Sequence, residues 1–557
     1  MKYFSALLLL ILIGCIGFSC SYHPATKPTQ SLPDELHWRG RFINEDLVLS
    51  VSIYRSAEDQ FTGDLQLHAG LERLQNDKLS MIRMESDSLF FKIPSKETLF
   101  KGAISKDLSS IIGIFTFPDG SQHPFSGSQG QNMGSNEAGG SYPRKLGWDE
   151  AFEDLISLDA LLREHHPNPF LYFPEEEYTE DLQQFRQTIQ DSIGVDDLYR
   201  FLAPHIAGIG CNHTVIRPSN DWLRGELRFL PIGVAVRNDS LFLVSTMKDH
   251  SGLQPGSLIL AINGINGATV ISRLMEAISS DGNNPGHKQW QLIRQFGVLY
   301  PLIFGSSLEY RVAVLTDLGE ETFSLAGIPF DPKMHIPGPP PAVNTIQTTL
   351  DAETGFAILT IPIFAFPDMG IFLQDLAAFF QMCRTNSIKS LVIDVRDNEG
   401  GHPLFAMEAL RFLLPDSFRY FTGETESPEM MMLTEYQPVS PDRFKGKIYV
   451  LMNSGCTSTT GHFLAILKAN RQVTFLGTQS GSGFSCNDFS GMFALPNSQI
   501  QVHIPRMNFA VAVQDLEQTT VIQPDIQISQ SLEDQLSADD LVLKSAIKKI
   551  RELESRP

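Results

Sequence analysis

The chain has 557 residues, of which 42% are hydrophobic and 19% are charged, a composition that excludes a wholly disordered chain and a coiled coil. Because one domain usually needs about 100–200 residues, this length predicts roughly three to four domains. The formal net charge is −21. With no basic excess we predict no nucleic-acid partner, and an anionic membrane surface would repel the body of the chain.

Residues 1–20 are typical of a bacterial export signal. A charged start precedes the apolar run from Phe4 to Ile13, which small residues and cysteines follow, as in a secretory signal peptide. The run is too short for a membrane-spanning helix of about 20 residues. Its end, Leu12-Ile13-Gly14-Cys15, resembles the bacterial lipobox, and Phe18-Ser19-Cys20 is a looser version.

Lipidation at Cys15 or Cys20 would tether the chain to a membrane and leave its body soluble. We therefore expect a lipid-anchored protein of the bacterial cell envelope, with its body in the periplasm or at the cell surface. A plain cleaved signal peptide is the alternative. Residues 21–34 are polar and contain prolines, which suits a flexible tether.

Residues 35–126 show short runs of alternating apolar and polar residues, such as Leu47 to Ile53 and Ile111 to Phe117. Period-two alternation between turn residues predicts antiparallel strands. Their closure into a small barrel or sandwich would remove exposed edges. No catalytic pattern occurs here, so we expect an accessory domain. Residues 127–147 begin with a stretch rich in Gly, Ser, Gln and Asn and form a predicted linker.

Residues 148–222 have the apolar spacing of helices, first from Phe152 to Leu162 and then from Tyr178 to Ile189, and a third helix is predicted to start with Asp196 as its N-cap. It leads into a glycine-punctuated turn, Gly208 to Thr214. Strands are predicted over residues 223–330. Within them, Gln254 to Gly264 resembles the matching stretch of PDZ domains, which bind an extended C-terminal peptide at a sheet edge.

Residues 340–530 alternate buried strands with helices. Ser390 to Val395 and Ile448 to Met452 are continuous apolar runs, as expected for strands covered on both faces. A helix is predicted over Thr459 to Asn470. The C-terminal segment, residues 531–557, is predicted to contain a terminal helix over Ala538 to Glu554. The predicted fold class is multidomain α+β with an α/β core.

Four polar or glycine-containing stretches follow one another along this core: Asp394 to Gly401, Asn453 to Thr460, Gly477 to Gly483 and Gln523 to Ile526. In this order they resemble serine peptidases of the C-terminal-processing (tail-specific) type and of the tricorn-protease type. The resemblance covers about residues 148–557 and includes the helical and PDZ-like segments. It implies a ClpP/crotonase-like core, protein or peptide substrates, and no metal or organic cofactor.

Ser458 matches the nucleophile of these peptidases. At the start of a helix, free backbone N–H groups and the helix dipole favour negative charge, which an acyl-transfer oxyanion requires. The N–H of Thr459 is one candidate donor, and that of Gly400 or Gly401 is the other, because glycine allows a close backbone approach. The alternative is that Ser458 only caps the helix.

A serine nucleophile also needs a general base. The tail-specific branch usually takes a Lys from the loop that corresponds to Thr478 to Phe484, and this loop has none. In the tricorn-type branch the base is a His to which His213 corresponds, and imidazole accepts protons near neutral pH. An acidic residue, Glu517 or in its place Asp515, would complete the network. His462, one helical turn after Ser458, competes as a base.

Four cysteines remain in the body of the chain. We hypothesise a Cys456–Cys486 disulfide, since an exported protein permits one. Cys456 is an alternative nucleophile, and without paired CxxC spacing we predict no metal site. Two functions follow from the sequence: a lipid-anchored serine endopeptidase, or a catalytically inactive peptide-binding or scaffold lipoprotein on the same fold.

Overall fold

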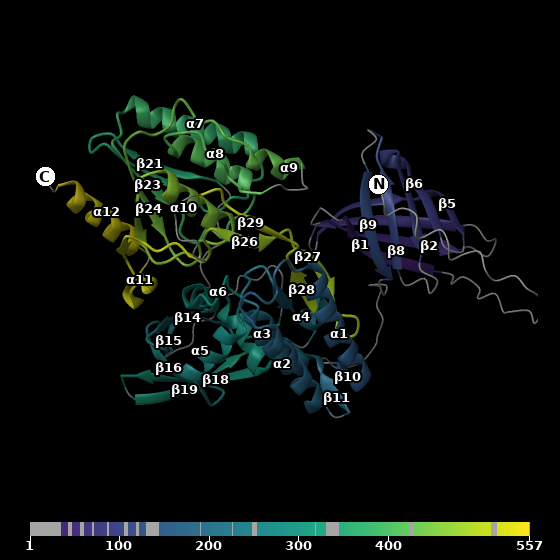
Figure 1. Cartoon of the computed structure of the whole chain (residues 1–557). Helices are drawn as coiled ribbons and strands as arrows, with labels where there is room; N and C mark the ends of the chain where they lie inside the picture. Colours follow the sequence, from purple (N-terminus) through teal and green to yellow (C-terminus); the bar gives the residue numbers. More distant parts are fainter. Residues whose placement is uncertain are drawn as a thin grey trace, which may run out of the picture. The chain divides into compact units, whose positions relative to one another are not determined.

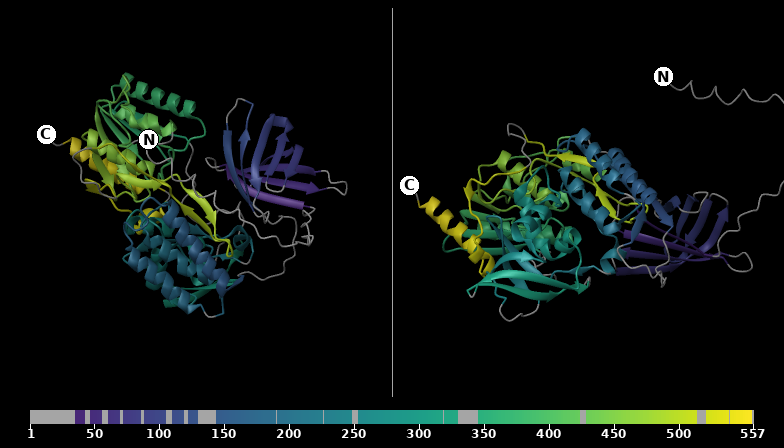
Figure 2. Two further views of the ribbon diagram at one scale, coloured as in Figure 1. Left: turned by 45° about the vertical axis from the view of Figure 1, so that its right-hand side comes forward. Right: turned by 90° about the horizontal axis from the view of Figure 1, so that it is seen from below.

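The computed structural model folds into two compact units, Met1–Gly139 and Gly140–Pro557, which are described separately (Figures 1 and 2). No helix among the described residues is long and apolar enough to cross a membrane. The structure describes residues 35–42, 47–55, 61–69, 72–85, 88–104, 110–118, 122–129, 144–189, 191–225, 227–247, 253–317, 319–329, 345–423, 428–513, 521–537 and 539–555.

The first unit is a single nine-stranded antiparallel sheet in the order β4-β3-β2-β1-β9-β8-β7-β6-β5. The end strands β4 and β5 are consecutive in the chain, and Leu79 between them donates its N–H to Gly63 O at 2.8 Å, so the sheet curls round (Figure 1). The rings of Phe91, Phe100 and Phe115 lie against one another in its interior. The strands are β1 (Glu35–Phe42), β2 (Leu47–Arg55), β3 (Phe61–Ala69), β4 (Glu72–Lys78), β5 (Ser80–Glu85), β6 (Ser88–Ile93), β7 (Thr98–Ile104), β8 (Ser110–Thr116) and β9 (Gln122–Gln129).

The second unit begins with three helices, α1 (Trp148–His165), α2 (Glu175–Thr188) and α3 (Val195–Gly208). The prediction that Asp196 caps α3 is wrong. Gly194 is the N-cap, and Asp196 lies in the first turn, where a carboxylate complements the helix dipole. The helices share a core with the hairpin of β27 (Gly491–Ala494) and β28 (Gln501–Ile504). Because β12 (Val215–Arg217) pairs with β28, the turn before β12 is tied to residues from far along the chain.

The next region is a six-stranded antiparallel sheet with two helices, α5 (Gly267–Glu276) and α6 (Pro285–Phe304). The sequence predicted only strands here, and that prediction is wrong for both helices. Asn284 caps α6, Pro285 occupies its first turn, and Leu292, Phe296 and Tyr300 are buried at four-residue spacing. The strands are β14 (Ile232–Arg237), β15 (Ser240–Thr246), β16 (Leu258–Ile262), β17 (Ile265–Asn266), β18 (Glu309–Thr316) and β19 (Gly319–Ala326).

The core sheet has the order β21-β22-β23-β24-β25-β30, parallel from β22 to β30. Helices α7 (Met369–Thr385), α8 (Pro403–Leu413) and α10 (Thr459–Asn470) pack on one face, and α12 (Leu541–Glu554) packs on the other (Figures 1 and 2). The prediction of strands covered on both faces is therefore confirmed. The strands are β21 (Gln347–Asp351), β22 (Phe356–Thr360), β23 (Ser390–Asp394), β24 (Lys447–Met452), β25 (Thr474–Gly477) and β30 (Ile526–Gln527).

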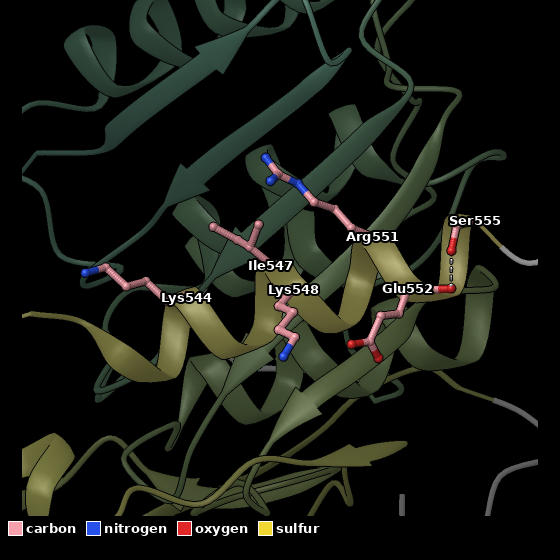
Figure 3. Close-up of a pocket in the computed structure, with 6 residues that line it drawn as sticks. All are labelled: Lys544, Ile547, Lys548, Arg551, Glu552 and Ser555. Carbon is pink, nitrogen blue, oxygen red and sulfur yellow. Dashed lines mark hydrogen bonds between the residues drawn. The ribbon is translucent and has the colours of Figure 1, made fainter.

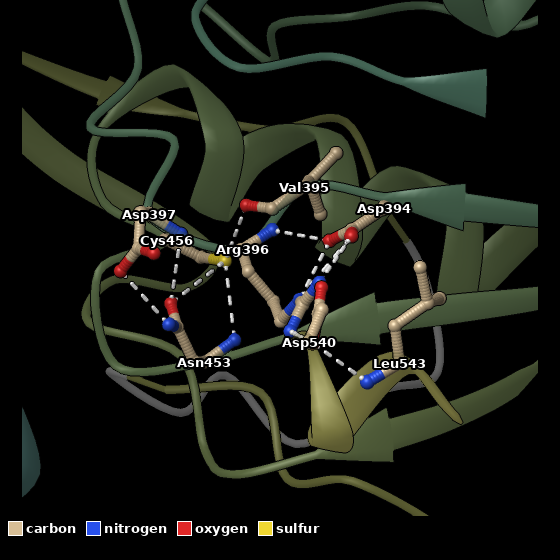
Figure 4. A network of polar contacts seen from close by, with 8 residues as sticks. All are labelled: Asp394, Val395, Arg396, Asp397, Asn453, Cys456, Asp540 and Leu543. Atoms are coloured by element: carbon tan, nitrogen blue, oxygen red, sulfur yellow. Dashed lines mark hydrogen bonds and ion pairs between the residues drawn. The ribbon is translucent and has the colours of Figure 1, made fainter. Parts of the chain in front are cut away.

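Helix α12 is tied to the carboxyl end of β23 by Arg396. Its guanidinium donates to Asp394 Oδ2 at 2.6 Å and to Asp540 Oδ1 at 2.9 Å (Figure 4). Burial alone would raise the pKa of Asp540, but the hydrogen bonds from Arg396 hold it below its ordinary value. This network anchors the start of the loop that follows β23.

The exposed side of α12 forms a surface hollow of about 550 Å³ (Figure 3). Its lining comes from that helix and the residue after it. None of the residues singled out by the sequence contributes to it. The lining residues are Lys544, Ile547, Lys548, Arg551, Glu552 and Ser555. The candidate site lies instead where the parallel strands end, because their carboxyl ends meet at one edge of the sheet.

Several histidines of the second unit are buried and neutral. Burial lowers the pKa of His166 and His205 to about 4 and that of His462 to about 3. Neither ring nitrogen of His205 has a hydrogen-bond partner among the described residues, although Asp181 Oδ2 lies 3.8 Å from its Nδ1. Its ring lies against Phe173, Tyr178 and Phe201, with centroid distances of 5.3, 4.5 and 5.6 Å.

We predict that acid destabilises this unit through these histidines. Below pH 6.5 the unfolded chain binds protons that the folded one excludes until about pH 4, so the free energy of unfolding falls over this range. His205→Phe should remove about 2 kcal/mol of the loss between pH 7 and pH 5. Urea unfolding of both proteins at pH 7 and pH 5 measures this loss. An equal fall in the free energy of unfolding in the two proteins would contradict the assignment.

Candidate active site

Ser458 lies at the start of α10, directly after the turn that follows β24. Its side chain is almost fully buried, with 6% of the residue exposed. The backbone has φ 53° and ψ −127°, a region that costs a non-glycine residue about 1–3 kcal/mol. Although it occupies the N-cap position, its hydroxyl accepts no hydrogen bond from the helix. Helix capping therefore does not explain why a serine stands here.

The loop after β23 presses its backbone against Ser458. Gly400 and Gly401 have φ values of 101° and 130°. A β-carbon on Gly400 would lie 2.8 Å from Ser458 Cβ and 3.0 Å from Thr459 N. No residue with a side chain fits this contact. The positive φ and the close approach to Ser458 therefore both require glycine at position 400.

The same loop decides which backbone donors are free. The N–H of Gly400 donates to Asn398 Oδ1 at 2.9 Å, so it is already occupied. In the described part of the chain, the N–H groups of Gly401 and Thr459 donate to no acceptor. Of the three donors that the sequence singled out, these two are available to an oxyanion beside Ser458.

Side chains fix the loops after β23 and β24 to each other. Asp397 and Asn453 exchange two hydrogen bonds of 2.9 Å, from Asp397 N–H to Asn453 Oδ1 and from Asn453 Nδ2 to Asp397 Oδ1 (Figure 4). Trp290 of α6 donates its Nε1–H to the same Asp397 oxygen at 2.6 Å. The glycine backbone is thus held beside Ser458 from two sides.

His213 lies in the turn between α3 and β12, and its side chain is 20% exposed. Its Nε2 is 3.7 Å from Asp488 Oδ2, at the end of β26 (Ser485–Asp488). Its Nδ1 is buried and has no hydrogen-bond partner in the described residues. No hydrogen bond joins His213 to Ser458 in this structure. The sequence did not single out Asp488, because its closeness to His213 arises only from the tertiary fold.

Asp281 is a second carboxylate that the sequence analysis did not single out. It lies between the turn that carries His213 and the loop that carries Ser482. Its Oδ1 accepts the N–H of Asn212 at 2.9 Å, and its Oδ2 accepts the hydroxyl of Ser482 at 2.5 Å. Ser482 Oγ in turn accepts the N–H of Ser458 at 3.0 Å. The polar run from Ser279 to Asn284 was the signal available in the sequence.

His462 and His287 are two further histidines near the site. His462 is fully buried, and its Nε2 lies 3.5 Å from Cys486 Sγ. His287 of α6 has Nδ1 2.8 Å from Ser454 O and Nε2 2.9 Å from Asn212 Oδ1, and burial lowers its pKa. Both rings therefore lie in buried surroundings that favour the neutral form.

All four described cysteines are free, so the predicted Cys456–Cys486 disulfide is wrong. Their thiols point to different partners: Cys456 Sγ donates to Val395 O at 3.0 Å, whereas Cys486 Sγ lies against His462. Burial raises the pKa of both thiols well above the ordinary value. A buried thiol that keeps its proton is a poor nucleophile, which argues against Cys456 in that role.

Some predicted residues lie outside the described part of the chain: Glu517 and Asp515, and the two candidate lipidation sites Cys15 and Cys20. Within the described residues, no group of three or more His, Cys, Asp or Glu side chains has the arrangement of a metal site.

Residues 356–528 match the model of peptidase family S41. The crystal structure of mature CPAF is 15% identical, with a TM-score of 0.53 over 73% of this chain and 97% of that one. Mature CPAF complexed with lactacystin is also 15% identical, with a TM-score of 0.52 over 73% and 98% of the chains. These two likenesses show a shared fold. No curated protein compared with the chain matches it.

We predict that Gly400→Ala disables the site. The new methyl group collides with Ser458 and Thr457, and alanine is strained at φ 101°, so the free energy of unfolding should fall by more than about 2 kcal/mol. Labelling of Ser458 by a fluorophosphonate probe should slow at least about 100-fold.

Gly319→Ala is the matched control, because Gly319 has φ 111° but nothing within 4 Å of a new β-carbon. It should cost about 1–2 kcal/mol of stability and leave labelling unchanged. Normal labelling of Gly400→Ala would contradict the steric argument.

Proposed function

Because the chain belongs to peptidase family S41, we propose that it hydrolyses peptide bonds of protein or peptide substrates with Ser458 as the nucleophile and His213 as the general base. One observation carries this assignment. The Ser458 hydroxyl is buried at a helix start that it does not cap, beside two backbone N–H groups that donate to no acceptor among the described residues. This arrangement suits an attacking oxygen and an oxyanion better than a structural serine.

The reaction would run through a covalent acyl-enzyme. Ser458 Oγ attacks the scissile carbonyl carbon while His213 takes the hydroxyl proton, and the N–H groups of Gly401 and Thr459 stabilise the resulting oxyanion. The C–N bond then breaks as His213 returns the proton to the leaving amine. Water, deprotonated by His213, hydrolyses the ester, and Ser458 regains its proton.

The imidazolium formed during each step needs a negative neighbour. Asp488, 3.7 Å from His213 Nε2, is one candidate, and Glu517, which the family resemblance suggests, is the other. Hydrogen bonds between base and nucleophile are often long or absent in free enzymes and tighten when substrate binds. The missing bond between His213 and Ser458 is therefore compatible with this role.

The PDZ-like region would supply substrate binding. Strand β14 lies at one edge of its sheet, the position at which an extended peptide adds as a further strand. Helix α6 packs beside it, and Gln289 donates its Nε2–H to Val236 O at 3.2 Å. Strand addition recognises the backbone, with side-chain pockets adding preference, so we propose protein segments or exposed C-termini as substrates.

We predict that Ser458→Ala and His213→Gln abolish hydrolysis of a peptide library, monitored by mass spectrometry. Ser458→Ala removes the attacking oxygen, and His213→Gln removes the base, which alone contributes about 10²–10⁴-fold in rate. His462→Gln tests the competing base. Loss of activity in His462→Gln with normal activity in His213→Gln would reverse the two roles.

The alternative is a catalytically inactive peptide-binding lipoprotein. Two observations favour it: the loop from Thr478 to Phe484 has no Lys, and His213 and Ser458 are not hydrogen-bonded. The same experiment decides between the functions. Under the alternative, the wild-type chain leaves every peptide of the library intact.

We further propose that the chain is lipid-anchored in the bacterial cell envelope. The support is the sequence around Cys15 and Cys20. A clickable fatty acid should label the wild-type chain and the variant that retains the modified cysteine, and one of Cys15→Ala and Cys20→Ala should lose the label. Labelling in neither the wild type nor the variants would leave a plain cleaved signal peptide.

A further inference from the structure

We propose that Asp281 is a positioning residue of this active site, which sets the turn carrying His213 against the backbone of Ser458. The inference rests on the proposed function, because it names the group that aligns that function's base and nucleophile. Asp281 lies between α5 and α6 in the chain, far from both His213 and Ser458 in sequence.

The two carboxylate oxygens of Asp281 hold two different segments. Oδ1 accepts the N–H of Asn212, the residue before His213, and Oδ2 accepts the hydroxyl of Ser482. Ser482 passes the contact on, because its Oγ accepts the N–H of Ser458. A chain of three hydrogen bonds, 2.9, 2.5 and 3.0 Å long, thus runs from the base's turn to the nucleophile.

Neighbours of Asp281 strengthen the same junction. The N–H of Gly282 donates to Gly210 O at 2.9 Å, and the hydroxyl of Ser279 donates to Thr214 O at 2.7 Å. These contacts hold the turn that carries His213 at Gly210, before the histidine, and at Thr214, after it. Asn284 donates its Nδ2–H to Gly481 O at 3.1 Å, next to Ser482. The short segment 279–284 therefore clamps both halves of the site.

The charge of Asp281 indicates more than a packing role. The residue is 7% exposed, and no Lys or Arg of the described residues forms an ion pair with it. A buried carboxylate without a cationic partner is costly unless hydrogen bonds compensate. An amide would cost less to bury but has a single acceptor oxygen, so it can accept only one of the Asn212 N–H and the Ser482 hydroxyl, and its NH₂ group would turn Ser482 from a donor into an acceptor. Only the carboxylate accepts both hydrogen bonds in their present directions.

Such alignment matters because catalysis tolerates little displacement. A shift of about 1 Å in a reacting group can cost about 100-fold in rate. The nucleophile is also held at an unfavourable φ, so its N–H contact with Ser482 helps to keep it there. Loss of the Asp281 link should therefore slow the chemical step and leave substrate binding, which other regions provide, nearly unchanged.

Asp281→Asn tests the proposal, with Asp154→Asn as the matched control. Asp154 is likewise a buried carboxylate, 0% exposed, that accepts two hydrogen bonds, from Asn497 N–H and Ser498 N–H at 2.8 Å each, but it lies in α1 outside the site. For the full chain on a cleavable peptide, Asp281→Asn should lower kcat about 10- to 100-fold with KM within about two-fold. Asp154→Asn should lower Tm and leave kcat unchanged.

Ser482→Ala cuts the same link at its other end and decides the matter if Asp281→Asn fails to fold. It should lower kcat similarly, and in combination with Asp281→Asn it should add little further loss. A normal kcat in Asp281→Asn or Ser482→Ala, with activity that still depends on Ser458, overturns the positioning role alone. Hydrolysis that survives Ser458→Ala overturns the proposed function instead.

Discussion

The site depends on one steric constraint, the direct contact of two backbone loops at Ser458. Strands β23 and β24 are parallel neighbours, with Asp394 paired to Leu451, so the loops that follow them leave the sheet side by side. They meet without a side chain between them because Gly400 has none. The contact also places Gly400, whose next residue is Gly401, against the backbone nitrogen of Thr459.

Polar contacts maintain this geometry against its cost. A typical hydrogen bond contributes a net of about 1 kcal/mol, and holding Ser458 at φ 53° costs about 1–3 kcal/mol. One contact would not suffice, and several converge here. Asp397 with Asn453 ties the two loops, Asn398 fixes the glycine backbone, and Trp290 adds a contact from α6. Side chains from three parts of the chain thus share the task of holding one strained residue.

The sequence predicted what local patterns encode. Continuous apolar runs located β23 and β24, and the predicted helix over Thr459 to Asn470 coincides with α10. Helices α5 and α6, in the region predicted to contain only strands, were not predicted, although α6 has an N-cap residue, a Pro in its first turn and apolar residues at four-residue spacing. The disulfide was predicted from a cysteine count, which permits pairing without specifying which thiols meet.

Asp281 and Asp488 could not be found in the same way. Asp488 has no neighbouring motif, and the polar run around Asp281 does not indicate which residues it meets. Each carboxylate reaches the His213 turn only because β12 pairs with β28 and the segment before α6 folds against that turn and the loop of Ser482. Their contacts join residues far apart in the chain. A single sequence carries no local signal of such partnerships, whereas the glycine and serine that touch across adjacent parallel strands lie in stretches that already stand out.

Electrostatics, more than closeness in sequence, separates the two candidate bases. His462 lies one helical turn from Ser458, but it is fully buried and burial lowers its pKa to about 3. Charging it costs on the order of 5 kcal/mol more than charging an ordinary histidine. His213 is partly exposed and has the carboxylate of Asp488 3.7 Å from Nε2, which compensates a developing positive charge. A base that must become an imidazolium in every turnover is therefore better provided by the distant His213 than by the adjacent His462.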